Sequence, residues 1–220
     1  MNEKILAHCN KCLGDRNHQI LFHEPTAWED GHSGVYGGNN WSLIKCLGCD
    51  DVRFRHQHWF SEDTDFDGTP ITYSNFYPPT QIRNKPGWAD LYLTKSAGEN
   101  EIRDLVDEIY LTFAAGALRL TVMGIRALAE KVMVEAVGDK GDFGKNSTAF
   151  FAAGYIAERQ QPLFKKVLIE AGHAAMHRVW QPNIEDISTL LDILEGIMRT
   201  IYVDPHRAKR VEIPQRDITK

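Results

Sequence analysis

The chain has 220 residues, a hydrophobic content of 43% and a formal net charge of -5 at pH 7. No run approaches the roughly 18 consecutive apolar residues of a membrane-spanning helix, so we expect no membrane segment. The negative net charge argues against bulk electrostatic attraction to nucleic acid, but a local basic site stays open because steering depends on how charge is distributed. The length suits a small metal-stabilised module followed by a larger helical domain.

All four cysteines fall in two pairs with two residues between the members, Cys9 with Cys12 and Cys46 with Cys49. Two intervening residues allow one tight backbone turn to aim both sulfurs at the same ion, and Zn²⁺ favours four thiolates in a tetrahedron. The sequence therefore predicts a structural zinc site formed by these four cysteines.

Other uses of the cysteines and other ligands are less favoured. Disulfides need an oxidising compartment, but residues 1–7 lack an apolar core of signal-peptide length, which predicts a reduced, cytoplasmic protein. A thioredoxin-like pair would be single and at a strand-to-helix junction. His8, His18 and His23 are alternative ligands, although with four thiolates available we expect them to be ordinary surface histidines.

The first sixty residues contain short β-like runs between turn signals. These runs lie at residues 19–22, 41–45 and 51–55, and the glycine-rich stretch 31–40 is predicted to be a loop. The pattern predicts a small zinc-ribbon-like β module over residues 1–60, which would have little core without its metal.

Prolines and acidic residues begin to dominate at Ser61, so residues 61–97 are predicted to be a linker or wrapping arm. Within this segment, Asp63–Gly68 resembles the opening of a calcium-binding loop. The position of the closing glutamate is Ser74 and Pro70 interrupts the loop, so a solvated acidic turn is the favoured interpretation.

A helical period of 3.6 residues begins near residue 98. Helices are predicted over residues 98–114, 117–138, 146–158 and 161–179, with a last helix that Asn183 and Asp186 can cap. The second of these is apolar around most of its circumference and should be central. The predicted fold class is therefore α+β, in which the β ribbon precedes a bundle of four or five helices over residues 98–203 and a polar tail over 204–220.

The helix predicted over residues 161–179 has two chemically different sides. At 100° per residue its apolar side carries Phe164, Leu168, Ala171 and Ala175, and the opposite side carries Lys166, Glu170, His173 and His177. The two histidines should face water or a partner subunit, where an imidazole titrates near neutrality and can act as an acid or base. A metal on this pair would lack a third ligand, and a plain solvated face is the competing interpretation.

Several arginines are further candidates. On the central helix, Arg126 and Glu130 are expected to form an internal ion pair or to line a polar cleft. Arg53 and Arg55, with nearby histidines and Trp59, are expected to be exposed and give a modest indication of nucleic-acid binding. Lys166 and Arg178 are the corresponding candidates in the helical half.

At these residues the chain resembles the HEPN superfamily (higher eukaryotes and prokaryotes nucleotide-binding), and most of all a bacterial branch with an N-terminal Cys-x-x-Cys ribbon. That branch has an Arg-x-x-x-Glu on its central helix, which matches Arg126 to Glu130. It has a Gly-Asn-x-x-x-His near the end of its penultimate helix, which matches Gly172-His173-Ala-Ala-Met-His177. Tyr77-Pro78-Pro79 before the helices is also similar.

The resemblance implies an all-helical bundle, usually a homodimer, whose active members cleave RNA without a metal. They place an arginine and, four to six residues later, a histidine in a cleft at the dimer interface. The histidine can move the proton of the ribose 2′-OH and the arginine can stabilise charge on the phosphate. By residue match His177 is the histidine and His173 the polar residue, but Gly172 stands at the arginine position, so Arg126 is the candidate substitute from another helix.

Two functions follow as expectations. The first is an RNA- or nucleotide-associated protein, with a metal-independent ribonuclease of a bacterial toxin or anti-phage defence system as its active form. Its partners would be a second copy, RNA or a nucleotide, and a protein of the same system. The alternative is a catalytically inactive dimeric scaffold, or partner-binding module, with a structural zinc.

Overall fold

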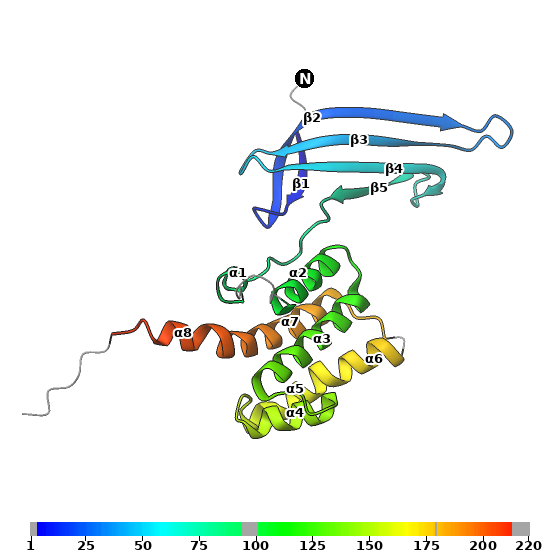
Figure 1. Ribbon diagram of the computed structural model, residues 1–220. Helices are drawn as coiled ribbons and strands as arrows, with labels where there is room; N and C mark the ends of the chain where they lie inside the picture. The colour runs from blue at the N-terminus through cyan, green and yellow to red at the C-terminus, as the bar shows by residue number, and fades with distance from the viewer. Residues whose placement is uncertain (1–3, 94–100, 179, 213–220) are drawn as a thin grey trace, which may run out of the picture. The chain divides into compact units, whose positions relative to one another are not determined.

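The computed structural model describes residues 4–93, 101–178 and 180–212 (Figure 1). The chain divides into two compact units, Met1–Asn84 and Lys85–Lys220, which we call the β unit and the helical unit. No helix in the described part of the chain is long and apolar enough to cross a membrane.

The β unit is a single antiparallel sheet of five strands in chain order, curled into a half-barrel (Figure 1). Each strand pairs with the next one along the chain. The strands are β1 (Lys4–Cys9), β2 (Gly14–Glu29), β3 (Tyr36–Cys46), β4 (Val52–Thr64) and β5 (Pro70–Tyr77).

The predicted small zinc ribbon over residues 1–60 is wrong, because the sheet is larger and continues to Tyr77. The stretch predicted as a linker includes the end of β4, all of β5 and the helix α1 (Gly87–Tyr92). β5 was missed because its aromatic residues find their partners on β4, where Tyr77 lies opposite Phe54 and Tyr73 opposite His58. Such pairing partners are not visible in the local pattern of a short, mostly exposed strand.

The acidic run between β4 and β5 forms the turn of this hairpin. Asp65 accepts hydrogen bonds at Oδ1 from the backbone N–H groups of Asp67 and Thr69, at 3.0 and 2.9 Å. Gly68 adopts a positive φ of 79°, which a residue with a side chain rarely does. The acidic residues therefore serve a solvent-exposed turn, as the favoured interpretation expected.

Stacked aromatic and histidine side chains of neighbouring strands line one face of the sheet. The rings of Trp41 and His56 stack with centroids 3.8 Å apart, and those of His58 and Tyr73 with centroids 5.4 Å apart. Cross-strand pairs of this kind contribute about 0.2–1 kcal/mol each. Gly37 on β3 leaves room for the indole of Trp28, since a Cβ there would come within 2.8 Å of that ring.

The helical unit is built around its longest described helix. Its elements are α1, α2 (Glu101–Ala114), α3 (Leu118–Val137), α4 (Phe143–Ala152), the 3₁₀ turn η1 (Glu158–Gln160), α5 (Gln161–Phe164), the π-helix η2 (Lys165–Glu170), α6 (Ala171–His177), α7 (Ile184–Met198), the π-helix η3 (Arg199–Val203) and α8 (Asp204–Ala208). α3 packs against α2, α4, α6 and α7 and buries Ile125, Leu128 and Val132, so the predicted central helix is confirmed.

Helix boundaries differ from the predicted ones where caps and widened turns intervene. α4 begins earlier because Asp142 accepts a hydrogen bond from the backbone of Lys145 and caps it. The predicted helix over 161–179 is divided by the π-helix η2. α7 begins with the expected capping box of Asn183 and Asp186, and helical structure continues to Ala208, within the predicted tail. Of the predicted segments, residues 94–100, 179 and 213–220 lie outside the described residues.

Candidate metal centre and candidate catalytic groove

The two cysteine pairs lie on turns of the same geometry. β1 ends at Cys9 and β3 ends at Cys46, and in each case the second cysteine follows within the turn. The next residue has a positive φ in both turns, 49° at Leu13 and 61° at Asp50. This backbone conformation is uncommon for residues with side chains, and its occurrence in both turns allows each pair of sulfurs to point in one direction.

The four sulfurs converge at one point. All four Sγ atoms lie within 4.8 Å of one another, with Cys9 and Cys49 3.5 Å apart and Cys12 and Cys46 4.0 Å apart. A zinc–sulfur distance of about 2.3 Å places tetrahedral sulfurs about 3.8 Å apart, so the spacing fits a four-coordinate metal ion. Cys9 and Cys46 are buried and the other two are half-buried.

Backbone donors favour a thiolate at this site, while the crowding of the thiols opposes it. Burial raises the pKa of Cys46, but the backbone N–H groups of Gly48 and Cys49 lower it to about 7. The N–H of Asp51 lowers the pKa of Cys49, but burial and the neighbouring cysteines raise it to about 12. Four sulfurs this close cannot all carry charge unless a cation is bound between them.

The three alternative histidine ligands are outside this cluster. His18 is fully buried, which contradicts its expected surface position, and its Nδ1 donates to the carbonyl of Arg16 at 2.9 Å. His23 is exposed and its Nδ1 lies 3.2 Å from the hydroxyl of Ser42. Among the described residues, the group that could hold a metal ion therefore offers sulfur atoms alone.

The basic residues of β4 do not form an exposed surface. Arg53 is only 1% exposed, so the prediction that it faces solvent is wrong. Its guanidinium donates to the carbonyls of His8 and Pro78 at 2.7 and 2.8 Å. Arg55 is half-buried, opposite Ser42 on β3. An alternating strand pattern shows which residues share a face, but not which face the rest of the chain covers.

The helix that carries the two candidate histidines has the predicted sidedness. Phe164, Leu168 and Ala175 are buried, whereas Lys166, Glu170, His173 and His177 are exposed. The rings of His173 and His177 contact each other with centroids 4.7 Å apart. The π-helix η2 immediately before α6 widens the backbone by one residue per turn, a feature that is common at functional sites.

Arg126 extends from α3 onto this helix. Its aliphatic part lies against Gly172, where an added Cβ would come within 2.6 Å of the Arg126 Cδ. Its guanidinium donates to the carbonyl of Ile169 at 3.0 Å and lies 4.1 Å above the ring of Phe143. Among the described residues, Arg126 and Glu130 do not form the expected ion pair. The Ile169 carbonyl and the Phe143 ring hold the Arg126 guanidinium instead.

An open groove of about 470 Å³ is lined by Arg126, Ile169, Glu170, His173 and Arg178. The structure thus brings three of the predicted site residues together, and His177 contacts His173 beside them. Two guanidinium groups and an imidazole, with one carboxylate among them, suit a phosphate group. Lys166 is exposed on η2.

The groove depends on a residue whose role the sequence did not reveal. By resemblance, Gly172 matches the glycine of the Gly-Asn-x-x-x-His motif and stands at the arginine position of active members, but its missing side chain is also what allows Arg126 to lie against α6. Phe143, which lies beneath the guanidinium, was also missed, because it lies before the helix predicted at 146–158. A glycine in mid-helix, which lowers helix propensity, was the available signal.

Comparison with known proteins supplies one match. Residues 107–215 match a family described as "Domain of unknown function (DUF4145)". The matched segment runs from within α2 past α8, so it contains Arg126, Gly172, His173 and His177. No curated protein and no solved structure is significantly similar to the chain.

Proposed function

We propose that this chain is a HEPN-like, RNA- or nucleotide-associated protein that binds a phosphate group in the groove of Arg126, His173 and Arg178. Its proposed reaction is RNA cleavage without a metal at the reacting phosphate. The observation that carries the proposal is the crossing of Arg126 over Gly172, which brings a guanidinium from α3 to the histidine-bearing face of α6.

Each residue of the proposed site has a role that its chemistry supports. His177, exposed at the end of α6, would take the proton of the ribose 2′-OH as that oxygen attacks the phosphorus. His173, whose ring contacts that of His177, would position it or return a proton to the leaving oxygen. Arg126 and Arg178 would stabilise the charge that gathers on the phosphate oxygens.

The departure at position 172 can be reconciled with this role. In the resembled family, active members carry an arginine at the position of Gly172. Here a side chain at that position would collide with Arg126, whose Cβ and Cγ would also lie within 3.1 Å of it. The glycine and the arginine on α3 therefore act as a pair that supplies the guanidinium by another route.

We further propose that the four cysteines hold Zn²⁺ as a structural ion. A set of four sulfur ligands with no open position is typical of structural zinc and leaves no coordination site for a substrate. The ion would join the β1–β2 turn to the β3–β4 turn, which are 34 to 40 residues apart along the chain. A homodimer in the cytoplasm, within a toxin or anti-phage defence system, completes the proposal.

Cleavage is tested with mixed cellular RNA, the full chain, and the variants His177→Ala and Arg126→Lys. Loss of the acid–base group should lower the cleavage rate by about 10²–10⁴-fold. Arg126→Lys keeps the charge but loses the planar, two-pronged donor, so a loss is expected there too. His32→Ala, an exposed histidine of the β unit, serves as the matched control and should cleave like the wild type. Equal rates for wild type and His177→Ala would exclude the proposed reaction.

A catalytically inactive dimeric scaffold is the alternative function, and one observation favours it. The guanidinium of Arg126 already contacts the Ile169 carbonyl and the Phe143 ring, as a purely structural arginine would. A scaffold predicts no cleavage by any variant, RNA binding that does not depend on His177, and a stable dimer in sedimentation experiments.

A further inference from the structure

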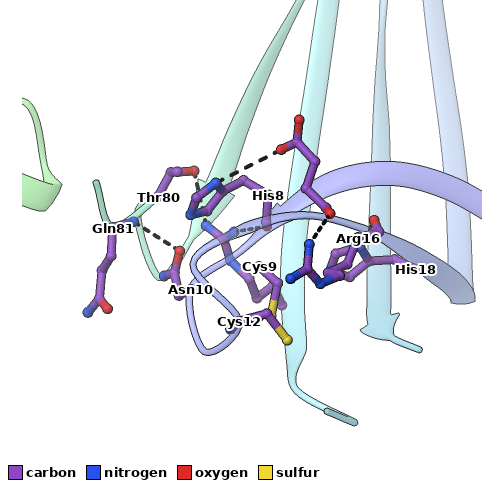
Figure 2. Close-up of polar contacts among 10 residues, drawn as sticks. His8, Cys9, Asn10, Cys12, Arg16, His18, Thr80 and Gln81 are labelled. Carbon is purple, nitrogen blue, oxygen red and sulfur yellow. Dashed lines mark hydrogen bonds and ion pairs between the residues drawn. The ribbon is translucent and has the colours of Figure 1, made fainter. Parts of the chain in front are cut away.

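The segment by which the chain leaves the sheet is attached to the first cysteine turn. This exit segment, residues 78–81, follows β5 and precedes the helical unit in sequence. Asn10, which lies between Cys9 and Cys12, accepts from the N–H of Gln81 at 2.9 Å (Figure 2). Its Nδ2 donates to the carbonyl of Pro79 at 2.8 Å. Its amide thus satisfies two backbone groups of the exit segment.

Arg53 forms a second attachment of the same segment. Its Nη2 donates to the carbonyl of Pro78 at 2.8 Å and to the hydroxyl of Thr80 at 3.2 Å. Its Nη1 donates to the carbonyl of His8, next to Cys9, at 2.7 Å. One guanidinium therefore joins the exit segment to the strand that carries the first cysteine.

No described carboxylate lies at close range to the charge of Arg53, whose guanidinium is 4.9 Å from the centroid of the Phe76 ring. Arg53 is 1% exposed, and its described hydrogen bonds all go to neutral oxygens. Its Nε is buried with no described partner. Burial lowers the pKa of Arg53, while the charges of Asp51 and Cys9 oppose that shift. An unpaired buried charge costs several kcal/mol.

A metal bound by four thiolates is a nearby negative charge. A divalent ion with four thiolate ligands carries a net charge of about -2, because each thiolate contributes one negative charge. Asn10 and Arg53 are both connected to the cysteine turn, the first by sequence and the second through His8. Metal binding would therefore fix the turn that presents Asn10 and balance the buried guanidinium at the same time.

We infer that the four-cysteine centre is a latch: with metal bound, Asn10 and Arg53 hold the exit segment closed, and loss of the metal releases it. The inference rests on the proposed zinc site and extends it, because metal binding at the cysteines would then control whether the exit segment, which leads to Lys85, stays attached to the first cysteine turn. Because coupling is reciprocal, the exit segment should in turn strengthen metal binding.

The reciprocal effect is tested by zinc competition with a chromophoric chelator, using the full chain. Asn10→Ala and Arg53→Lys should weaken zinc binding by about 10–100-fold, the range expected for residues that support metal ligands without touching the metal. Lys11→Ala, an exposed neighbour in the same turn, is the matched control and should bind zinc like the wild type. Equal zinc affinity for Asn10→Ala, Arg53→Lys and the wild type would overturn the latch.

Hydrogen exchange at the Gln81 amide provides the second measurement, because that N–H donates to Asn10. It should be protected in the zinc-loaded wild type and exchange rapidly in zinc-loaded Asn10→Ala, while amides in the middle of β3 stay protected. Chelation of the wild type should also expose Gln81, together with the wider loss of structure expected in the β unit. If Gln81 stays protected after zinc is removed, the latch fails and the zinc site stands. If fresh reduced protein holds no zinc and Gln81 is protected, both proposals fail.

Discussion

The two units of this chain are stabilised by different kinds of buried group. In the described part of the β unit, the buried hydrophobic side chains are Ala7, Cys9, Ile44 and Cys46, and the other buried side chains are Asn10, His18, Ser42 and Arg53. The helical unit instead buries a continuous cluster of aliphatic and aromatic residues centred on α3. The contrast teaches that a sheet of this size can depend on a cysteine cluster and polar contacts where its hydrophobic core is small.

This difference predicts that metal loss and core substitutions affect the stability of the two units differently. A unit with few buried apolar groups should lose its structure when the metal leaves, because the metal-binding free energy is then a large part of its folding free energy. A unit with a large apolar cluster should lose stability when a cavity is made in that cluster, and its stability should not depend on the metal. The four predictions below test this separation, from the largest expected effect to the smallest.

Cys46→Ser should unfold the β unit. Structural zinc contributes about 10–16 kcal/mol of apparent binding free energy at neutral pH, and removal of one ligand should eliminate much of that free energy. Trp28, Trp41 and Trp59 lie in the β unit, so tryptophan fluorescence should report the loss while helical ellipticity at 222 nm persists. A variant that retains both its zinc and its fluorescence would show that the sheet does not need the metal.

Ile125→Ala should destabilise the helical unit by about 2–5 kcal/mol, because Ile125 on α3 is only 1% exposed and its truncation leaves a cavity in the core. Denaturant titration followed by ellipticity measures the change, and the zinc content should stay that of the wild type. Leu120→Ala, on the same helix and 57% exposed, is the control and should change stability by less than about 0.5 kcal/mol. Zinc loss from Ile125→Ala would contradict the independence of the two units.

Gly172→Ala should cost about 1–3 kcal/mol, because the new methyl group would meet the side chain of Arg126 at 2.6 Å. Gly196→Ala on α7 is a matched control: no heavy atom lies within 4 Å of its added Cβ, and alanine should stabilise the helix by about 0.5–1 kcal/mol. Thermal unfolding of the two variants should therefore shift in opposite directions. The same sign for both would show that Arg126 does not pack on α6.

Asn183→Ala should cost about 1 kcal/mol, since the capping box at the start of α7 would be lost. Asn183→Ser keeps an oxygen that can accept from the backbone of Asp186 and should stay close to the wild type. Urea titrations of the helical unit can resolve the two. Equal destabilisation by serine and alanine would mean that the side-chain cap contributes little.

Local patterns predicted part of the fold and part of the site. The spacing within each cysteine pair predicted the convergence of sulfurs that the structure places within 4.8 Å. The period of the helix before residue 179 predicted that His173 and His177 would be exposed, and they are. The size of the sheet was not predicted, because the partners of β5 lie on β4 and its own residues are mostly exposed.

The sequence by itself determined the two cysteine pairs, the amphipathic helices and the cap of α7, because each depends on residues within a few positions of one another. Tertiary structure alone decided that Arg53 is buried against the exit segment and that Arg126 crosses Gly172 to reach the histidines. A long side chain reaches across several ångströms to groups more than twenty residues away in sequence, so its environment is set by packing. For that reason the four-cysteine cluster could be predicted from the residue spacing, whereas the groove and the contacts of Arg53 with the exit segment could be found only in the folded chain.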